Sequence, residues 1–403
     1  MTDLSEFQRK PRHRLTHPRG FEPGIQWDGR TGSITAELPD EPDQAVWDVL
    51  IADWGLDPAR TQVVDGSLQI RAWDAPDPET GGLRRLKYYR ATIAPRTDHH
   101  DRADVDALCE KVEKRKPAKA PDRPTTEQGF LVVLSDWQLG KSQEVGVGTP
   151  ETTERILNAL DASVRRYKEL VRIGRNPGVV YLIGLGDLVE ACSGHYDMQT
   201  FVSDLTDREQ DKLARRLILK AIDSYVDIGA TVVAMGVPGN HGENRKNGKA
   251  YTNLLDNRDY AAFETVAEIT AANPERYRNV HIPTQIINND DLTMVLDIGG
   301  VPTAFAHGHQ FRSGANSQAK LESWWKGQAL GRTQVADAEI LLSGHLHHFV
   351  VSESTGRTVI QVPAMDGGSR WFTATSGASS EAGMVSMLIG QEFTRRWSDL
   401  LIL

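Results

Sequence analysis

Five short groups of Asp, Asn and His residues follow one another along the C-terminal two-thirds of the chain. Carboxylate, amide and imidazole groups together can hold two divalent ions open to water and substrate. The residue types therefore indicate a site for two divalent ions. In order, the groups are Asp136-Trp137-Gln138, Gly186-Asp187, Gly239-Asn240-His241-Gly242-Glu243, His307-Gly308-His309 and Gly344-His345-Leu346-His347.

Each group comes just after a run of apolar residues rich in β-branched side chains. Such runs, bounded by Gly or polar residues and separated by helical patterns, are typical of buried strands. Side chains that lie past the carboxyl ends of strands meet at one edge of a sheet, where α/β proteins usually bind ligands. The predicted strands cover residues 131–134, 179–183, 231–235, 301–306 and 340–342.

Helical patterns fill the intervals between these strands. Alternation of strands with helices predicts the α/β class, with helices covering both faces of the sheet. The predicted helices cover residues 152–172, 207–227, 260–272 and 317–327.

The five groups in this order resemble the motifs of the calcineurin-like metallophosphoesterase superfamily: D-x-H, G-D, G-N-H-[DE], a strand-end His and G-H-x-H. The resemblance covers residues 128–375. It implies a four-layer α/β/β/α sandwich, in which the run 358–362 supplies part of the second sheet. More loosely, the chain resembles phage and bacterial DNA-repair exonucleases of the SbcD type, whose capping domain is not recognisable here.

The resemblance also implies the metal ligands. Imidazole combined with oxygen donors favours Mn²⁺, with Fe, Zn, Ni or Mg as alternatives. Asp187 is expected to bridge the two ions. The first ion would be held by Asp136, Gln138, Asp187 and His347, and the second by Asp187, Asn240, His307 and His345.

Gln138 departs from the family pattern, which has a second His at this position. A neutral amide oxygen in place of an imidazole nitrogen makes the first metal site harder and weaker. His241 follows the pattern: the resemblance implies that it is not a ligand but lies over the substrate as a proton donor.

Five further residues are expected near the site rather than on the metals. His309 is placed by its spacing for a hydrogen bond to a ligand, and Glu243 has a family analogue that orients the neighbouring His. His195 could reach a substrate phosphate or be a simple loop residue. Arg245 and Lys246 belong to a basic segment beside His241 that could bind further phosphates.

The amino-acid composition limits the classes of protein to which the chain can belong. With 403 residues, 39% hydrophobic and 25% charged, the chain is long enough for two domains. No apolar run approaches the roughly 20 residues of a membrane span, and residues 1–20 lack the apolar core of a signal peptide. The two Cys residues are far apart, which fits a reducing compartment. A cytoplasmic protein without a membrane partner is expected.

The N-terminal part has a different organisation. Residues 1–20 are basic and expected to be mobile, and residues 21–105 predict a small α+β domain that could bind nucleic acid. In that domain we expect a strand over 33–38, a helix over 43–54 and a hairpin over 61–73 and 86–93. Residues 106–127, charged and containing Pro, read as a linker to a metallophosphoesterase domain over 128–403.

The predicted reaction is hydrolysis of a phosphodiester by hydroxide held on the two metals, with His241 as proton donor. The appended domain and the basic segment favour DNA as substrate, and hence an exonuclease or endonuclease with a role in DNA repair. The net charge of −9 argues against a uniformly basic surface. Two alternatives stay open: a small-molecule phosphatase or cyclic-nucleotide phosphodiesterase, and a catalytically weak pseudo-enzyme that binds nucleic acid. A partner protein or a homo-oligomer also stays open.

Overall fold

The computed structural model divides into two compact units, residues 1–100 and 101–403, which we call the first unit and the second unit. The N-terminus predicted to be mobile lies outside the described residues. Among the helices that the structure describes, none is both long and apolar enough to span a bilayer. The structure describes all residues except 1–20, 29–31, 40, 59–60, 65, 77–81, 96–99, 118–125, 143–147, 197–198, 284–291, 312–316, 332, 367 and 369–380.

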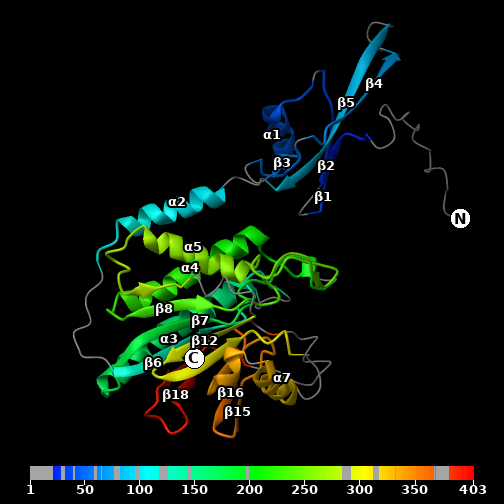
Figure 1. Ribbon diagram of the computed structural model, residues 1–403. Coiled ribbons are helices and arrows are strands. Elements are labelled where there is room, and N and C mark those ends of the chain that lie inside the picture. Colours follow the sequence, from blue (N-terminus) through cyan, green and yellow to red (C-terminus); the bar gives the residue numbers. More distant parts are fainter. Residues whose placement is uncertain are drawn as a thin grey trace, which may run out of the picture. The chain divides into compact units, whose positions relative to one another are not determined.

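The first unit is an antiparallel sheet with one helix (Figure 1). Its strands lie in the order β1-β2-β5-β3, and β4 also pairs with β5. The predicted strand over 33–38 is confirmed as β2, whereas the predicted strand over 61–73 is two strands, β3 and β4, separated by a turn at Gly66 with φ of 74°. The bounds are β1 Gly24–Trp27, β2 Gly32–Glu37, β3 Thr61–Val63, β4 Gln69–Pro76 and β5 Leu83–Pro95.

Helix α1, Gln44–Asp53, covers one face of this sheet. The Asp43 side chain accepts the N–H of Val46 at 2.9 Å and so caps the helix. Trp47 and Ile51 of α1 are buried against apolar residues of β2 and β5, among them Ile34, Tyr89 and Ile93. The predicted helix over 43–54 is confirmed.

The second unit contains a six-stranded and a five-stranded sheet. The first has the order β11-β8-β7-β6-β17-β18, in which β6, β7, β8 and β11 are parallel. Its strands are β6 Thr126–Leu134, β7 Pro177–Gly184, β8 Val232–Gly236, β11 Val280–His281, β17 Val385–Ile389 and β18 Trp397–Ile402. The second has the order β12-β13-β14-β16-β15. Its strands are β12 Thr293–Ile298, β13 Val301–Ala306, β14 Ile340–Ser343, β15 Val350–Ser354 and β16 Arg357–Gln361.

The two sheets pack face to face. Leu131 and Ile183 of the six-stranded sheet lie in one buried cluster with Phe305, Leu342 and Ile360 of the five-stranded sheet. Because successive side chains of a strand point to opposite faces, every other residue of each strand points away from the partner sheet. These residues contact an outer layer.

Helices form both outer layers (Figure 1). On the six-stranded sheet, Phe130 and Leu182 pack with α3 Thr149–Arg172, α4 Asp207–Val226 and α5 Arg258–Ala271. On the five-stranded sheet, Leu341 packs with Leu321 and Trp325 of α7, Ser317–Gly331. This arrangement confirms the predicted four-layer α/β/β/α sandwich, and β16 confirms that the run 358–362 belongs to its second sheet. The expectation from strand and helix alternation that helices cover both faces of one sheet is wrong, because the second sheet packs on the inner face.

The predicted linker over residues 106–127 is wrong in its first part. Residues 106–113 belong to helix α2, His100–Glu113, and Val112 is fully buried in the core of the second unit. Val105, Leu108 and Cys109 pack against the same core. Their spacing places them on one helical face, which the many charged residues of this segment concealed.

A small hairpin follows the third motif. Strands β9, Arg245–Lys246, and β10, Lys249–Ala250, are joined by Asn247 and Gly248. Both turn residues have positive φ, 52° and 73°, as two-residue Asn-Gly hairpin loops require. The basic segment predicted beside His241 is therefore an ordered two-stranded element.

Candidate metal centre

The five motifs meet where strands of the two sheets end. Asp136, Asp187 and Asn240 follow β6, β7 and β8 of the six-stranded sheet, and His307 and His345 follow β13 and β14 of the five-stranded sheet. Backbone hydrogen bonds join these loops. The N–H of Asp136 donates to Gly186 at 3.1 Å, and the N–H of Gly344 donates to His307 at 2.9 Å.

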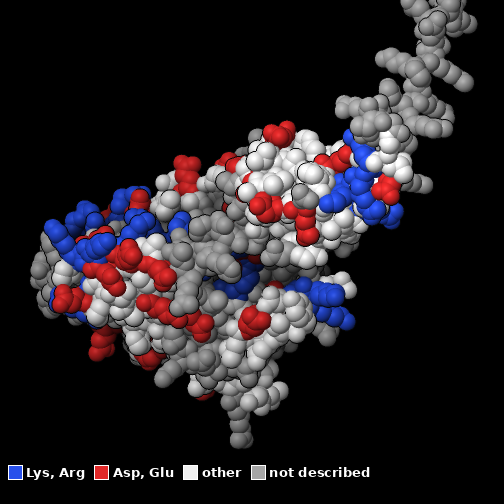
Figure 2. All heavy atoms as spheres, turned by 90° about the horizontal axis from the view of Figure 1, so that it is seen from above, with Lys and Arg blue, Asp and Glu red and all other residues white. Residues whose placement is uncertain are grey.

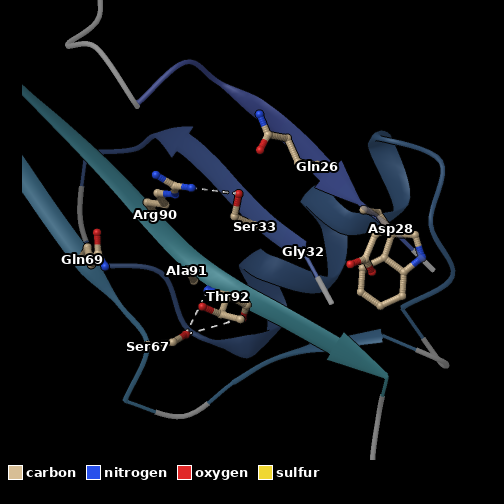
Figure 3. Close-up of a pocket in the computed structure, with 10 residues that line it drawn as sticks. Gln26, Asp28, Gly32, Ser33, Ser67, Gln69, Arg90, Ala91 and Thr92 are labelled. Atoms are coloured by element: carbon tan, nitrogen blue, oxygen red, sulfur yellow. Dashed lines mark hydrogen bonds between the residues drawn. The ribbon is translucent and has the colours of Figure 1, made fainter. Parts of the chain in front are cut away.

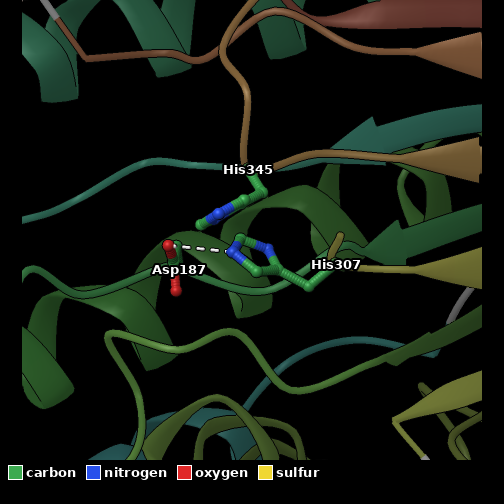
Figure 4. Close-up of side chains that lie close together, drawn as sticks. All are labelled: Asp187, His307 and His345. Carbon is green, nitrogen blue, oxygen red and sulfur yellow. Dashed lines mark ion pairs between the residues drawn. The ribbon is translucent and has the colours of Figure 1, made fainter. Parts of the chain in front are cut away.

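Three side chains come closest together. Asp187, His307 and His345 each offer a ligand atom, and these atoms all lie within 4.8 Å of one another. Figure 4 shows both imidazoles turned toward the Asp187 carboxylate, one from each neighbouring loop. Asn240 joins them, because its Oδ1 lies 3.1 Å from Nε2 of His307. All four residues of the predicted second metal site are thus brought together.

The hydrogen bonds of His307 show that this group fits a cation. Its Nδ1 lies 2.6 Å from the carbonyl oxygen of Leu185, so Nδ1 carries a proton and Nε2 points into the group. That nitrogen faces Oδ2 of Asp187 at 3.0 Å as well as the Asn240 oxygen. Both oxygens are matched when a positive charge, either a proton or a metal ion, lies on Nε2.

The charges of the site agree with this requirement. Burial acts to lower the pKa of His307, but the Asp187 carboxylate outweighs it and raises the pKa to about 9. His345 is the opposite case, since burial and the neighbouring His307 lower its pKa to about 4. A divalent ion can supply the positive charge that a proton on His307 would otherwise supply, and His345 is in the neutral form that binds metals.

The residues of the predicted first metal site have other partners. Asp136 Oδ1 lies 3.2 Å from Nε2 of His347, and Nδ1 of His347 lies 3.6 Å from Asp366. The amide oxygen of Gln138 accepts a hydrogen bond from Nζ of Lys141 at 2.7 Å, and Lys141 also forms an ion pair with Asp366. Donors and acceptors are therefore already matched in this part of the site.

Unusual backbone angles concentrate at the predicted ligands. Non-glycine residues seldom adopt positive φ, and each instance costs about 1–3 kcal/mol. Such costs are typical of positions where function requires one orientation of a side chain. Five residues of the predicted ligand set have this conformation: Asp136 at 49°, Gln138 at 42°, Asp187 at 52°, His345 at 69° and His347 at 58°.

His241 lies beside the metal-ligand group. Its backbone N–H donates to Oδ1 of Asp187 at 2.7 Å, while its Nδ1 lies 2.8 Å from the carbonyl oxygen and 3.3 Å from Oε2 of Glu190. Tyr196 donates to the other carboxylate oxygen of Glu190 at 2.6 Å. The His195 ring stacks parallel on the His241 ring, with centroids 4.5 Å apart. These contacts fix the orientation of the His241 imidazole.

Glu190 takes the place that Glu243 was expected to have. The Glu243 carboxylate pairs with Nε of Arg245 at 2.6 Å and lies 3.6 Å from Nε2 of His309. Lys246 is exposed on the hairpin. The structure thus brings Glu243, His309 and Arg245 together, but the carboxylate that contacts His241 is that of Glu190.

Asp259 is a functional candidate that the sequence did not reveal. Its carboxylate accepts the backbone N–H groups of Asp187 at 3.1 Å, Leu188 at 3.0 Å and Gly239 at 2.8 Å. Asn257, the N-cap of α5, donates to the carbonyl of Gly239 at 2.9 Å. In the sequence, Asn257 and Asp259 read only as a helix start.

Two loops approach so closely here that a side chain would not fit. A Cβ atom on Gly239 would lie 2.2 Å from both the nitrogen and the Oδ1 of Asp187. Glycine at this position therefore lets the loop after β8 pack against the loop after β7.

The first unit holds a separate polar cavity of about 600 Å³ (Figure 3). It lies on the sheet face opposite α1, because paired residues of antiparallel strands point to the same side. Nη2 of Arg90 lies 3.4 Å from Oγ of Ser33 within it. Its lining combines amides and hydroxyls with one carboxylate and one indole, from Gln26, Ser33, Ser67, Gln69 and Thr92, and from Asp28 and Trp27.

Basic residues do not cover the surface uniformly. On the face shown in Figure 2, Lys and Arg gather in separate groups with Asp and Glu between them. This distribution agrees with the net charge of −9.

No family model and no curated protein matches the chain. Matching solved structures include a predicted phosphoesterase from Streptococcus pneumoniae TIGR4, with 15% identity over 68% of this chain and 90% of that one, at a TM-score of 0.28. An archaeal phosphodiesterase has 14% identity over 68% of this chain and 99% of that one, at a TM-score of 0.30. Zinc-bound Vps29 from Entamoeba histolytica has 14% identity over 65% of this chain and 86% of that one, at a TM-score of 0.26.

Proposed function

We propose that the chain is a metal-dependent phosphoesterase whose site lies at Asp187, Asn240, His307 and His345. The observation that supports this most is that Oδ2 of Asp187 and Oδ1 of Asn240 lie 3.0 and 3.1 Å from Nε2 of His307, with His345 beside them. A divalent ion bound there would polarise a phosphoryl oxygen and lower the pKa of water.

The surrounding residues would supply the rest of the chemistry. Leu185 and the buried Asp187 orient the His307 imidazole. His241 is held on Glu190 beside Asp187, where it can donate a proton or hydrogen bond to the leaving oxygen of the ester. The stacked ring of His195 limits the rotation of His241.

We further propose that the ester is a phosphodiester of nucleic acid. Support comes from the basic hairpin formed by Arg245–Lys246 and Lys249–Ala250. The carbonyl of Gly194 accepts the N–H of Gly248, so this hairpin lies next to His195. The cavity of the first unit adds an arginine with amide and hydroxyl groups, which suit phosphate and sugar contacts. A nuclease is therefore the favoured enzyme class.

The test compares three substrates under one condition. Full-length protein with Mn²⁺ is assayed on linear duplex DNA, single-stranded DNA and bis(p-nitrophenyl) phosphate. We expect cleavage of DNA and of the small diester. Hydrolysis of small esters alone would favour a small-molecule phosphatase or phosphodiesterase, and DNA binding without turnover would favour a pseudo-enzyme.

The contribution of the first unit can be tested on one strand. The Arg90→Ala variant should lower the affinity for DNA while leaving turnover of bis(p-nitrophenyl) phosphate unchanged. Arg85 is a matched control, because it lies on the opposite face of β5, where it pairs with Asp74 at 3.5 Å. Equal effects of the two substitutions on DNA affinity would count against the cavity as a binding site.

A further inference from the structure

Lys141 places a buried positive charge inside the predicted first metal site. Its side chain is 13% exposed, and it forms an ion pair with the Asp366 carboxylate, which is 4% exposed. Nζ of Lys141 also donates to Oε1 of Gln138 at 2.7 Å. The one predicted ligand that departs from the family pattern is therefore the one that contacts this ammonium group.

Asp366 connects Lys141 to the other residues of the site. One of its oxygens pairs with Lys141, and the other lies 3.6 Å from Nδ1 of His347. Nε2 of His347 in turn lies 3.2 Å from Asp136. In the chain Lys141, Asp366, His347 and Asp136, nitrogen groups alternate with carboxylates, so each carboxylate has a partner within the protein.

A metal ion on Gln138 would have to share its oxygen with Lys141. Metal–oxygen bonds are about 2.0–2.2 Å long, so an ion on Oε1 would lie within about 5 Å of Nζ, given the 2.7 Å hydrogen bond. A divalent ion and an ammonium group at that separation, in a buried site, repel each other strongly. A lysine has three donors and no lone pair, so it cannot become a ligand while it is charged.

In the predicted second metal site, the described group that faces the Asp187 and Asn240 oxygens is the His307 imidazole, whereas the group that faces Gln138 and Asp366 is the Lys141 ammonium. An imidazole can exchange its proton for a metal ion and become a ligand. The two halves of the site thus differ in kind: the cationic group of one can become a metal ligand, and that of the other, while it is charged, cannot.

We infer that the Lys141 ammonium replaces the first of the two metal ions, so that the site binds one divalent ion, at Asp187, Asn240, His307 and His345. This inference rests on the proposed function of that site. Lys141 balances the charge of Asp366 and occupies the amide oxygen of Gln138. The same arrangement accounts for the glutamine at position 138. Its amide oxygen accepts a hydrogen bond from the Lys141 ammonium group, whereas an imidazole at this position would present a nitrogen that binds metal ions in competition with that hydrogen bond.

Metal stoichiometry tests the inference without relying on activity. Full-length protein is stripped with chelator, loaded with Mn²⁺ and analysed by plasma mass spectrometry and electron paramagnetic resonance. We expect a single Mn²⁺ per chain with the spectrum of an isolated ion. Two ions with a spin-coupled spectrum would overturn the inference and leave the proposed function standing, whereas no bound metal would contradict the proposed function itself.

Three variants identify the cause. Lys141→Met should admit a second Mn²⁺ and give a spin-coupled spectrum, while Gln138→His, which keeps Lys141, should still bind one ion. Lys220→Met is the matched control, because Lys220 is exposed on α4, and it should also bind one. A second ion in Gln138→His but not in Lys141→Met would overturn the role of Lys141. If Lys141→Met does not fold, the stoichiometries of the natural chain and of Gln138→His still decide the matter.

Discussion

The carboxylate of Asp259 lies directly behind Asp187 and accepts its backbone N–H at 3.1 Å. The same carboxylate accepts the N–H of Gly239, which belongs to the loop of Asn240 and His241, at 2.8 Å. A single fully buried side chain thus holds two of the motif loops in register. Groups that orient metal ligands in this way commonly matter nearly as much as the ligands themselves.

Replacement of Asp259 should therefore impair the metal centre without unfolding the protein. In Asp259→Ala, three backbone N–H groups lose their acceptor, and we expect Mn²⁺ affinity and kcat/KM to fall about 10- to 100-fold. Asp259→Asn keeps one acceptor oxygen and should be less affected. Glu264→Ala, exposed on the same helix, is the control for titration calorimetry and rate measurements. An Asp259→Ala variant with unchanged metal affinity would remove Asp259 from this positioning role.

Asp187→Asn should abolish most metal binding and nearly all turnover. The substitution removes the negative charge that faces His307 at 3.0 Å, so the site no longer attracts a divalent ion. Mass spectrometry of the loaded variant measures the bound metal. Turnover like that of the natural chain would show that Asp187 is not a ligand.

His241→Ala should keep its metal but lose its proton donor. The expected loss on DNA is about 10²- to 10⁴-fold, the usual contribution of a positioned acid. On a p-nitrophenyl ester, whose leaving group departs without a proton, the loss should be smaller. Glu190→Gln, which removes the carboxylate 3.3 Å from Nδ1, should show the same substrate dependence with a smaller loss. Equal losses on both substrates would make His241 a binding residue instead.

Helix α2 should be required for the stability of the second unit. Val112 is fully buried there, and Asn273 donates to the carbonyl groups of Val112 at 2.7 Å and Arg115 at 3.0 Å. Val112→Ala should lower the free energy of unfolding by about 1–3 kcal/mol through loss of buried apolar volume. Glu110→Ala, exposed on the same helix, should change it little in urea denaturation.

The same helix determines how the first unit can be removed. A chain that starts at residue 100 keeps α2 and should unfold at the temperature of the second unit in the full protein. A chain that starts at residue 126 lacks α2 and should unfold at a lower temperature. Equal unfolding temperatures in calorimetry would contradict the packing of α2 described here.

Much of the sandwich could be predicted from sequence, for a physical reason. The runs before Asp136, Asp187 and His307 are apolar on both faces, as strands buried between a helix layer and a second sheet must be. Ligand residues at the ends of such strands can meet only at one edge. The local sequence pattern was therefore sufficient to predict both the fold and the principal residues of the site.

The supporting residues could not be found in the same way. Glu190, Asp259 and Lys141 act through tertiary contacts with residues 51, 72 and 225 positions away in the chain. A lone Asp at a helix start or a lone Lys in a loop has the same local pattern whether it is exposed or buried. Of these three residues, Glu190 is the one that the sequence could have indicated, because it lies three residues after Asp187, at a strand end that already provides a ligand.

The central claim is that hydrolysis depends on a divalent ion at Asp187, His307 and His345. The most direct measurement is the rate of bis(p-nitrophenyl) phosphate hydrolysis as Mn²⁺ is titrated into chelator-stripped protein, with bound metal measured in the same samples. We predict no turnover in the stripped protein and a rate that rises in proportion to bound Mn²⁺ in the natural chain, with no such rise in Asp187→Asn. Full turnover in excess chelator, or equal rates in the natural chain and Asp187→Asn, would contradict the account.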